Sequence, residues 1–232
     1  MDIHTIILAG GKGTRMLSQK AKVLQVLGGI TMLNHVMTAA NKISNKISVV
    51  VGFDKEGVEE EIKKIGINAD TFLQKEQIGT ADAVKTTLKD IDKNEKILIL
   101  YGDVPLIKEE TLKKLCNQES DLSILTTSLE NPTGYGRALK DKENNVIGII
   151  EEKDADLEQK KIGEIFTGIL STKGIVLKKY IPEINNNNSA KEFYLTDLIG
   201  IAHKNGFKIN TLSSSNEETA GANDRIEQSK KS

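Results

Sequence analysis

The stretch Leu8-Ala9-Gly10-Gly11-Lys12-Gly13-Thr14-Arg15-Met16 follows an apolar run, residues 5–8, and is the part of the sequence that decides the fold. The apolar run predicts a buried first strand, and the stretch after it predicts a loop with three glycines, a lysine and an arginine. Glycine has no Cβ atom, so the backbone can turn tightly and approach a ligand closely. Successive N–H groups in such a loop bind anions, and Lys12, Arg15 and the nearby Lys22 add positive charge. The stretch therefore predicts a polyphosphate-binding loop.

Neither of the two common phosphate-binding motifs matches this loop. A Walker A loop ends in Gly-Lys followed by Ser or Thr, whereas Gly13 is followed directly by Thr14. The dinucleotide fingerprint needs a third glycine three residues after the second, and Met16 occupies that position. Many α/β domains carry a glycine-rich turn after a strand for structural reasons, so the loop alone leaves a purely structural role open.

Composition and charge restrict the class of protein. The chain has 232 residues, of which 38% are hydrophobic and 28% charged, and its formal net charge is −1. A net charge this small gives no general attraction to nucleic acid or to a membrane. Cys116 is the single cysteine, which excludes an intrachain disulfide and a cysteine metal cluster. No apolar stretch has the length of a membrane span, so we expect a cytoplasmic protein with neither nucleic acid nor membrane as a partner.

Strands and helices alternate through the first half of the chain. Apolar runs predict buried strands at residues 5–8, 47–51, 70–73 and 96–101. This order predicts a doubly wound α/β sheet, in which ligands bind at the carboxyl ends of the strands. Gln74, Gly79-Thr80 and Gly102-Asp103 follow such strands, as the glycine loop does, and Thr80 is the expected N-cap of a helix.

The second half has a different pattern. Strands are expected at residues 121–129, 145–151, 165–171 and 208–212, a turn-rich loop at 131–137, and helices at 195–202 and from 217 onward. No linker interrupts the chain. We therefore expect a single domain over residues 1–232, with a nucleotide-binding lobe over about residues 1–115 and a smaller lobe over about residues 116–232.

Eight segments carry a resemblance to a known family, in the family's order. They cover residues 8–16 with 22–24, 74–80, 101–106, 131–137, 151–155, 167–169, 194–197 and 221–225. In these segments the chain resembles the pyrophosphorylase domain of the bacterial bifunctional N-acetylglucosamine-1-phosphate uridylyltransferases, within the nucleoside-diphosphate-sugar pyrophosphorylases. The resemblance implies a Rossmann-like, doubly wound mixed sheet of the nucleotide-diphospho-sugar transferase (GT-A-like) type, whose smaller lobe binds the sugar phosphate.

The resemblance implies an activity, substrates and a cofactor. The reaction is transfer of a uridylyl group from UTP to a sugar 1-phosphate, N-acetylglucosamine 1-phosphate above all, with release of pyrophosphate. Arg15 and Lys22 are the implied catalytic residues, because their charges would neutralise phosphate oxygens during in-line attack. Asp103 offers a hard oxygen ligand suited to Mg²⁺, and Asn223 is its implied partner on the metal. The alternative for Asp103 is a turn carboxylate that caps a helix start, and Asn223 taken alone reads as a surface asparagine.

The remaining site residues are also implied by the resemblance. The nucleotide-binding residues are Leu8, Ala9, Gly10, Gly11, Lys12, Gly13, Thr14, Gln74, Gly79, Thr80 and Gly102. The Gln74 amide can match the edge of a pyrimidine, and Gly79 lets the backbone approach the base. The sugar-binding residues are Tyr101, Gly136, Glu151, Phe166 and Thr196.

Three departures from the family pattern limit what the resemblance implies. Ala21 stands where the family has a proline before the lysine. Phe166 stands where an asparagine amide contacts the amino sugar, and losing such a bond changes specificity by about one to a few kcal/mol. The identity of the sugar is therefore open. The sequence contains no hexapeptide repeats, so acetyl transfer is not expected, and without the trimerising β-helix we expect a monomer or a weak homodimer.

Two alternatives to this function stay open. Within the same chemistry, the enzyme would use another sugar phosphate or another nucleotide. In a different class, the chain would be a non-catalytic nucleotide- or sugar-binding module. A decayed enzyme is expected to lose charged groups that serve catalysis alone, so the presence of all five of the expected site's charged or metal-binding groups argues against such a module. These residues are Lys12, Arg15, Lys22, Asp103 and Asn223.

Overall fold

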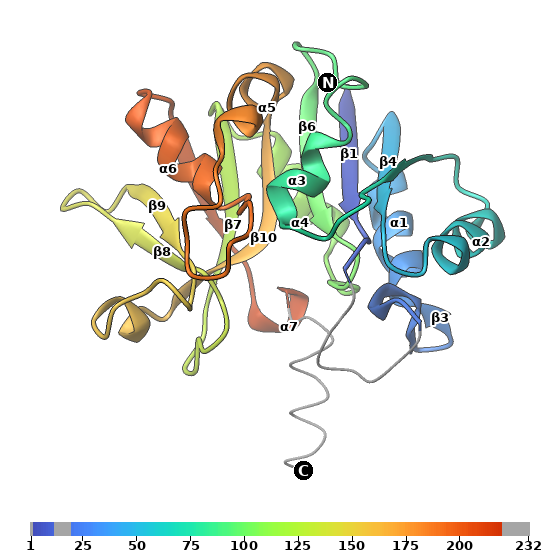
Figure 1. Ribbon diagram of the computed structural model, residues 1–232, viewed down its shortest axis with the longest axis horizontal. Helices are drawn as coiled ribbons and strands as arrows, with labels where there is room; N and C mark the ends of the chain where they lie inside the picture. The colour runs from blue at the N-terminus through green and yellow to red at the C-terminus, as the bar shows by residue number, and fades with distance from the viewer. Residues whose placement is uncertain (1, 12–19, 220–232) are drawn as a thin grey trace.

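A computed structural model describes residues 2–11 and 20–219 (Figure 1). The strands of the main sheet are β1 (Ile3–Leu8), β4 (Lys46–Val51), β5 (Asp70–Leu73), β6 (Lys96–Tyr101), β7 (Leu122–Ser128), β8 (Arg137–Lys140), β9 (Val146–Ile150), β10 (Glu164–Lys173) and β11 (Ile209–Ser213). The helices are α1 (Met32–Asn41), α2 (Lys55–Ile65), α3 (Thr80–Lys85), α4 (Glu109–Cys116), α5 (Gly174–Tyr180), α6 (Asp197–Lys204) and α7 (Asn216–Thr219). Short 3₁₀ helices are η1 (Lys22–Leu24), η2 (Gln159–Lys161) and η3 (Ile181–Glu183), and β2 (Val26–Leu27) pairs with β3 (Ile30–Thr31) in a small hairpin.

The main sheet is mixed, as predicted. Its strand order is β11-β7-β10-β6-β1-β4-β5, with β8 paired to β10 and β9 to β8. Strand β1 is parallel to β4 and to β6, whereas β10 is antiparallel to β6, β7 and β8. The sheet is continuous across residue 115, because β10 from the second half of the chain pairs with β6 from the first.

Two hydrophobic clusters cover the two faces of this sheet. Strand β6 contributes to both, since side chains alternate between faces along a strand. Ile97 and Ile99 pack in the cluster that includes α3, α5 and α6, whereas Leu98 and Leu100 pack in the cluster that includes α1, α2 and α4. Cys116 is buried in the second cluster.

The secondary structure differs from the prediction mainly after residue 130. Strand β8 begins at Arg137, which the prediction placed in a loop, and α5 at residues 174–180 was not predicted at all. Strand β8 has only four residues, which is too short for a clear alternation of apolar and polar side chains. Within the described part of the chain, no helix is long and apolar enough to cross a membrane.

The parallel strands of the first half all point the same way. In Figure 1, β1 and β6 begin near the top of the view and end near the bottom, on the side of α7. The loops that follow β1, β4, β5 and β6 therefore meet at one edge of the sheet. This is the edge where doubly wound sheets bind their ligands.

A buried histidine lies on the other half of β1. His4 is 1% exposed, with Nδ1 3.2 Å from Oε2 of Glu95 and Nε2 2.8 Å from Oγ of Ser48. The order Ser-His-Glu is that of a hydrolytic triad, but the Ser48 side chain is fully buried and no substrate can reach it. The three residues form a structural network, and burial lowers the pKa of His4 although Glu95 opposes the shift.

This network predicts a loss of stability in mild acid. An unfolded histidine takes up a proton near pH 6.5, whereas the lowered pKa of folded His4 resists it, so the unfolded state binds more protons as the pH falls below that value. The free energy of unfolding should therefore decrease between about pH 7.5 and 5.5, measured by urea denaturation. His4→Gln should show a smaller decrease, and the exposed control His203→Gln the same decrease as the wild type. An unchanged slope in His4→Gln would contradict the assignment.

Candidate functional site

The first part of the site is formed where β1, β4 and β5 end. The N–H of Phe53 donates to the carbonyl of Gly10 over 3.1 Å, and the N–H of Gln74 donates to the carbonyl of Val51 over 2.8 Å. A Cβ atom on Gly10 would lie 3.2 Å from the nitrogen of Gly52, so Gly10 serves close packing of two backbones. At Gly11, which is exposed, a Cβ atom would meet nothing within 4 Å. The predicted residues Lys12, Gly13, Thr14, Arg15 and Asn223 lie outside the described residues.

Lys22 and Asp103 meet at this edge. Lys22 opens η1, and Asp103 follows the end of β6. The Lys22 Nζ atom lies 2.5 Å from Oδ2 of Asp103, and the two side chains are 11% and 26% exposed. Gly102 keeps η1 close to the strands, since a Cβ atom there would lie 2.9 Å from Cγ1 of Val23. Residues 81 positions apart in the sequence thus form one ion pair, with each group still reachable from solvent.

Ala21 makes a bond that the family's proline cannot make. Its N–H donates to Oδ2 of Asp54 over 2.9 Å, and Asp54 has a left-handed backbone with φ of 54°. A proline has no N–H to donate. With alanine at position 21, this hydrogen bond to Asp54 fixes the backbone directly before Lys22.

The amide of Gln74 is already engaged within the protein. The residue is 5% exposed, and Nε2 donates to the carbonyl of Gly79 and to Oδ2 of Asp82, each over 2.9 Å. Two acceptors on this side fix the orientation of the amide. Oε1 makes no hydrogen bond to the described residues and lies 3.4 Å from the position of a Cβ atom on Gly10. The sequence predicted that both the donor and the acceptor of this amide would face the base. In the structure only the acceptor, Oε1, is available to a ligand.

Gly79 and Thr80 differ from their predicted roles. The N-cap of α3 is Gly79, not Thr80, and Thr80 is the first residue of the helix. Gly79 has φ of 133°, and a Cβ atom there would lie 2.3 Å from the carbonyl oxygen of Phe193. The Thr80 hydroxyl accepts the N–H of Leu195 over 2.9 Å. Both residues join α3 to the segment at 193–195, which the sequence spacing did not reveal.

Tyr101 at the end of β6 lies between the two halves of the site. Its ring fills the space beside Gly168, where a Cβ atom would lie 2.6 Å from the ring. Burial raises the pKa of Tyr101, so the phenol stays protonated and can donate a hydrogen bond.

The predicted sugar-binding residues of the second half come together. The Thr196 hydroxyl donates to Oε1 of Glu151 over 2.8 Å, and that oxygen lies 3.4 Å from the position of a Cβ atom on Gly136. The N–H of Phe166 donates to the carbonyl of Gly136 over 2.9 Å. Burial raises the pKa of Glu151, against the opposing hydrogen bond from Thr196. The Phe166 ring, 5% exposed, belongs to the first hydrophobic cluster, so the position that departs from the family packs in the core.

Arg137 and Glu152 were missed by the sequence analysis. Arg137 is 1% exposed; its guanidinium donates to Oε2 of Glu152 over 2.5 Å and also to the carbonyl of Tyr135. The same Glu152 oxygen accepts the N–H of Gly134 over 3.3 Å. These two residues directly follow Gly136 and Glu151, so an ion pair with a buried arginine ties the start of β8 to the end of β9. The only sequence signal was an arginine ending a glycine-rich loop.

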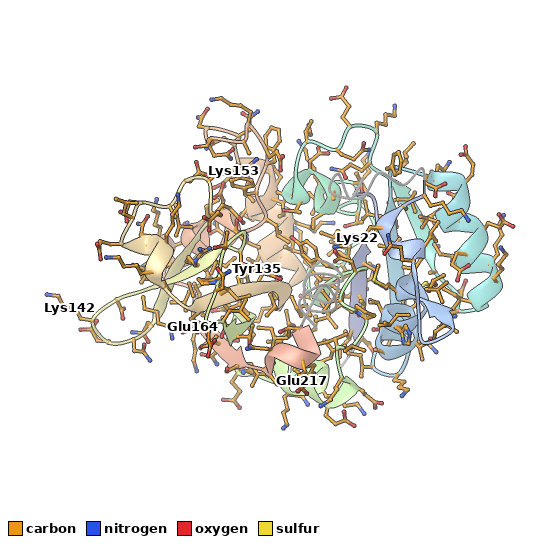
Figure 2. The ribbon with its side chains drawn as sticks, turned by 90° about the horizontal axis from the view of Figure 1, so that it is seen from below. Lys22, Tyr135, Lys142, Lys153, Glu164 and Glu217 are labelled. Atoms are coloured by element: carbon orange, nitrogen blue, oxygen red, sulfur yellow. The ribbon has the colours of Figure 1, made fainter. Side chains whose placement is uncertain are left out.

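Figure 2 looks along the sheet from the edge where the parallel strands end. It shows Lys22 on the side of β1 and Tyr135 on the side of β8 and β9, on the same face of the molecule. In residues 2–11 and 20–219, no three His, Cys, Asp or Glu side chains lie close enough to hold a metal ion. Among these residues, Asp103 is the carboxylate that pairs with Lys22. That set suits Mg²⁺, which usually takes one or two protein carboxylates and completes its shell with water and substrate phosphates.

Comparison with known proteins gives a family and a fold. Residues 5–149 match the MobA-like NTP transferase domain. Two relatives named bifunctional protein GlmU are 43% identical (Ruthia magnifica subsp. Calyptogena magnifica) and 42% identical (Vesicomyosocius okutanii subsp. Calyptogena okutanii) over 229 residues. Each alignment covers 97% of this chain and 50% of the relative, so the chain spans about half the length of these relatives. A Bacillus anthracis protein, named as a glucose-1-phosphate thymidylyltransferase and solved with sucrose, shares the fold with a TM-score of 0.73 at 21% identity, over 92% of this chain and 87% of its own.

Proposed function

The chain belongs to the MobA-like NTP transferase domain family, and on that premise we propose that it is a sugar-1-phosphate uridylyltransferase that makes UDP-N-acetylglucosamine. The observation that carries the proposal is the ion pair of Lys22 and Asp103, 2.5 Å apart, near the end of strand β1, which the glycine loop follows. This chain spans about half the length of the bifunctional relatives. The proposal therefore concerns nucleotidyl transfer alone.

Lys22 and Asp103 would exchange partners when substrates bind. Each group neutralises the other in the protein alone. UTP brings roughly four negative charges, which favour a move of the Lys22 ammonium from the carboxylate to phosphate oxygens. Asp103 would then be free to hold Mg²⁺, which supplies further neutralisation of the phosphates, and Asn223 is proposed as its second ligand. The sugar phosphate is an anionic nucleophile, so positioning and charge neutralisation suffice for in-line attack.

The engaged amide of Gln74 supports a uracil base. Its Nε2 hydrogens are both used within the protein, which leaves Oε1 as an acceptor beside Gly10. The uracil ring carries a donor at N3, whereas cytosine has an acceptor there. An acceptor placed opposite N3 therefore favours uracil or thymine, since cytosine could donate to it only from its exocyclic amino group.

The second half of the site supports a sugar with several hydroxyls. Glu151 and Thr196 share a hydrogen bond of 2.8 Å, and Gly136 leaves room beside the Glu151 carboxylate. The partly exposed Glu151 carboxylate accepts from one hydroxyl and has further lone pairs for others. Tyr101 adds a protonated phenol from the β6 side. We assign these four residues to the sugar phosphate.

The decisive experiment is pyrophosphate release from UTP and Mg²⁺ with a panel of sugar 1-phosphates. We expect the highest kcat/KM with N-acetylglucosamine 1-phosphate, lower values with glucose and galactose 1-phosphates, and little turnover when CTP replaces UTP. Higher turnover with a different sugar phosphate or nucleotide would change the assigned substrate but keep the reaction, nucleotidyl transfer to a sugar 1-phosphate. No turnover with any acceptor, together with measurable UTP binding, would instead support a non-catalytic binding module.

Phe166→Asn tests the open question of the sugar. The variant restores the amide that the family carries, and we expect the ratio of kcat/KM for N-acetylglucosamine 1-phosphate over glucose 1-phosphate to rise by about tenfold. Because the Phe166 ring is buried in the core, the variant should also lose about 3–5 kcal/mol of stability, so the kinetics belong at low temperature. Phe166→Leu is the control for lost volume. An unchanged ratio would show that this position does not select the sugar.

Arg137→Lys tests whether the Arg137–Glu152 ion pair positions the sugar site. The planar guanidinium donates to Glu152 and to the Tyr135 carbonyl together, which an ammonium cannot reproduce with the same geometry. We expect the KM for the sugar phosphate to rise about tenfold, while the KM for UTP stays within twofold. Lys140→Ala is the matched control. Lys140 lies on β8, as Arg137 does, and it also makes an ion pair, with its Nζ atom 2.6 Å from Oε2 of Glu164. Equal changes in both KM values would point to a general loss of folding.

A further inference from the structure

A cavity lies at the edge of the sheet opposite to the candidate functional site, where the parallel strands begin. It has a volume of about 1190 Å³ and is bounded by the start of β1, the loop before β6, the loop after α4 and the end of β10. In Figure 1 this is the upper edge, where β1 and β6 begin, away from α7. Lys96, which lines it, precedes Asp103 by seven positions along an extended strand, a separation of roughly 20 Å. A ligand here would not touch the nucleotidyl-transfer site.

Lys96 is a buried cation without a counter-ion. The residue is 7% exposed and lines the cavity. Among residues 2–11 and 20–219, no carboxylate lies within 4.0 Å of its Nζ atom and no side-chain hydrogen bond satisfies it. Burial also lowers the pKa of this ammonium, and the nearby Lys173 adds to the shift, whereas Cys116 and Asp121 oppose it. Such a group is costly unless something in the cavity pairs with it.

A second lysine stands directly opposite. Lys173 of β10 faces Lys96 of β6 in the antiparallel register, and like charges in that arrangement are unfavourable. Lys173 has a partner, because its Nζ atom lies 2.9 Å from Oδ1 of Asp121. Asp121 is therefore bonded to Lys173, and among the described residues Lys96 has no carboxylate of its own.

The other carboxylates of the lining are mostly engaged elsewhere. Glu95 accepts from the N–H of Asp92 over 3.0 Å and pairs with His4, and Asp121 also accepts from the N–H of Lys208 over 3.1 Å. Within the described part of the chain, the groups of the lining that make no ion pair are the cations Lys93, Lys96 and Lys208 and the acids Asp2, Asp92 and Glu119. Of these acids, Asp92 accepts from the N–H of Asn94 over 2.8 Å. The only such group that is also buried is Lys96.

We propose that this cavity binds a small oxyanion, a carboxylate or a phosphate monoester, with Lys96 as its buried anchor. An oxyanion would pair with the Lys96 ammonium and relieve its repulsion with Lys173. Lysine binds phosphate and carboxylate as a point charge and needs no fixed fork geometry. Asn94 and Gln118 line the same cavity and carry amide donors for the remaining oxygens. The inference is independent of the proposed function.

Titration with simple anions tests this site. Inorganic phosphate and succinate are added separately to the labelled protein at constant ionic strength, and backbone amide shifts are followed by NMR. We expect saturable shifts at residues 92–96 and 117–121 with at least one of the two probes, and the stronger probe identifies the ligand class. Lys96→Met should weaken that binding at least tenfold, whereas the exposed Lys89→Met should leave it unchanged. Lys22→Ala should also leave it unchanged, which separates this site from the catalytic one.

The folding of the variant is checked in the same experiment. Replacing an unpaired buried ammonium by an apolar side chain of similar length should leave the unfolding midpoint of Lys96→Met equal to or above that of the wild type. No saturation with either probe up to about 50 mM, shifts no larger than those from sodium chloride, or equal binding by wild type and Lys96→Met would each overturn the proposal.

Discussion

Replacing Lys22 by alanine is expected to lower kcat for nucleotidyl transfer by about 10³-fold, with a much smaller change in the KM for UTP. Removing one preorganised donor from a developing phosphate charge costs about 10²–10³ in rate, and a full cation delivered to a phosphoryl group is worth about 10³–10⁵. The effect falls on kcat because charge on the reacting phosphate redistributes most in the transition state. Pyrophosphate release at saturating substrates measures it.

Lys46→Ala is the matched control for Lys22→Ala. The Lys46 Nζ atom lies 2.7 Å from Oδ2 of Asp90, so this variant also removes a lysine from an ion pair, but at the start of β4, on the edge away from the site. Its kcat should stay within twofold of the wild type. If Lys22→Ala retained more than a tenth of the wild-type kcat, the ammonium would have no catalytic role and the ion pair would be structural.

Asp103→Ala is the second variant with a large expected effect. We expect kcat to fall by about 10²–10³-fold and the Mg²⁺ concentration at half-maximal rate to rise at least tenfold, because the variant removes the one carboxylate that stands beside Lys22 at the end of β6. A Mg²⁺ titration of pyrophosphate release measures both quantities. Asp103→Asn keeps an oxygen ligand without the charge. Its kcat and its Mg²⁺ dependence should lie between those of the wild type and those of Asp103→Ala.

The double variant separates the two roles of this ion pair. If Lys22 and Asp103 act on different substrates and charges, the losses in Lys22→Ala with Asp103→Ala should be close to additive in free energy. If the lysine only holds the carboxylate, the double variant should be no slower than Asp103→Ala alone. Asp90→Ala removes the carboxylate of the control pair and should leave the Mg²⁺ dependence unchanged. An unchanged Mg²⁺ dependence in Asp103→Ala would refute the proposed metal ligand.

Most of the sheet was predictable from local patterns. The bounds predicted for β5 and β6, residues 70–73 and 96–101, agree with the structure, because each is a short apolar run between turn residues. The prediction failed at β8, where Arg137 is buried by an ion pair with Glu152 rather than by any apolar pattern. It also misassigned the cap of α3, since the conformation of Gly79 is dictated by the backbone of Phe193, far away in the sequence.

For the candidate site, too, the sequence indicated some of the residues but not their contacts. The sequence singled out Gln74, Glu151 and Thr196 through the resemblance, but it could not show that the Gln74 donors are used internally or that Thr196 donates to Glu151. The Phe166 departure was visible as a change of residue. That its ring packs in the core, while its N–H donates to Gly136, was not. Hydrogen-bond partners depend on which strands become neighbours, and no local pattern encodes that.

By itself the sequence determined the class of fold, the loop of glycines after β1 and the residue types available for phosphate chemistry. These follow from properties that act over a few residues: side-chain alternation, turn preference and charge. The tertiary structure alone decided that Lys22 meets Asp103 and that Arg137 ties Gly136 to Glu151 through Glu152. It alone also decided that Lys96 is buried with no ion-pair partner among residues 2–11 and 20–219. Each of these depends on which segments the fold brings side by side, where burial strengthens a contact or leaves a charge uncompensated.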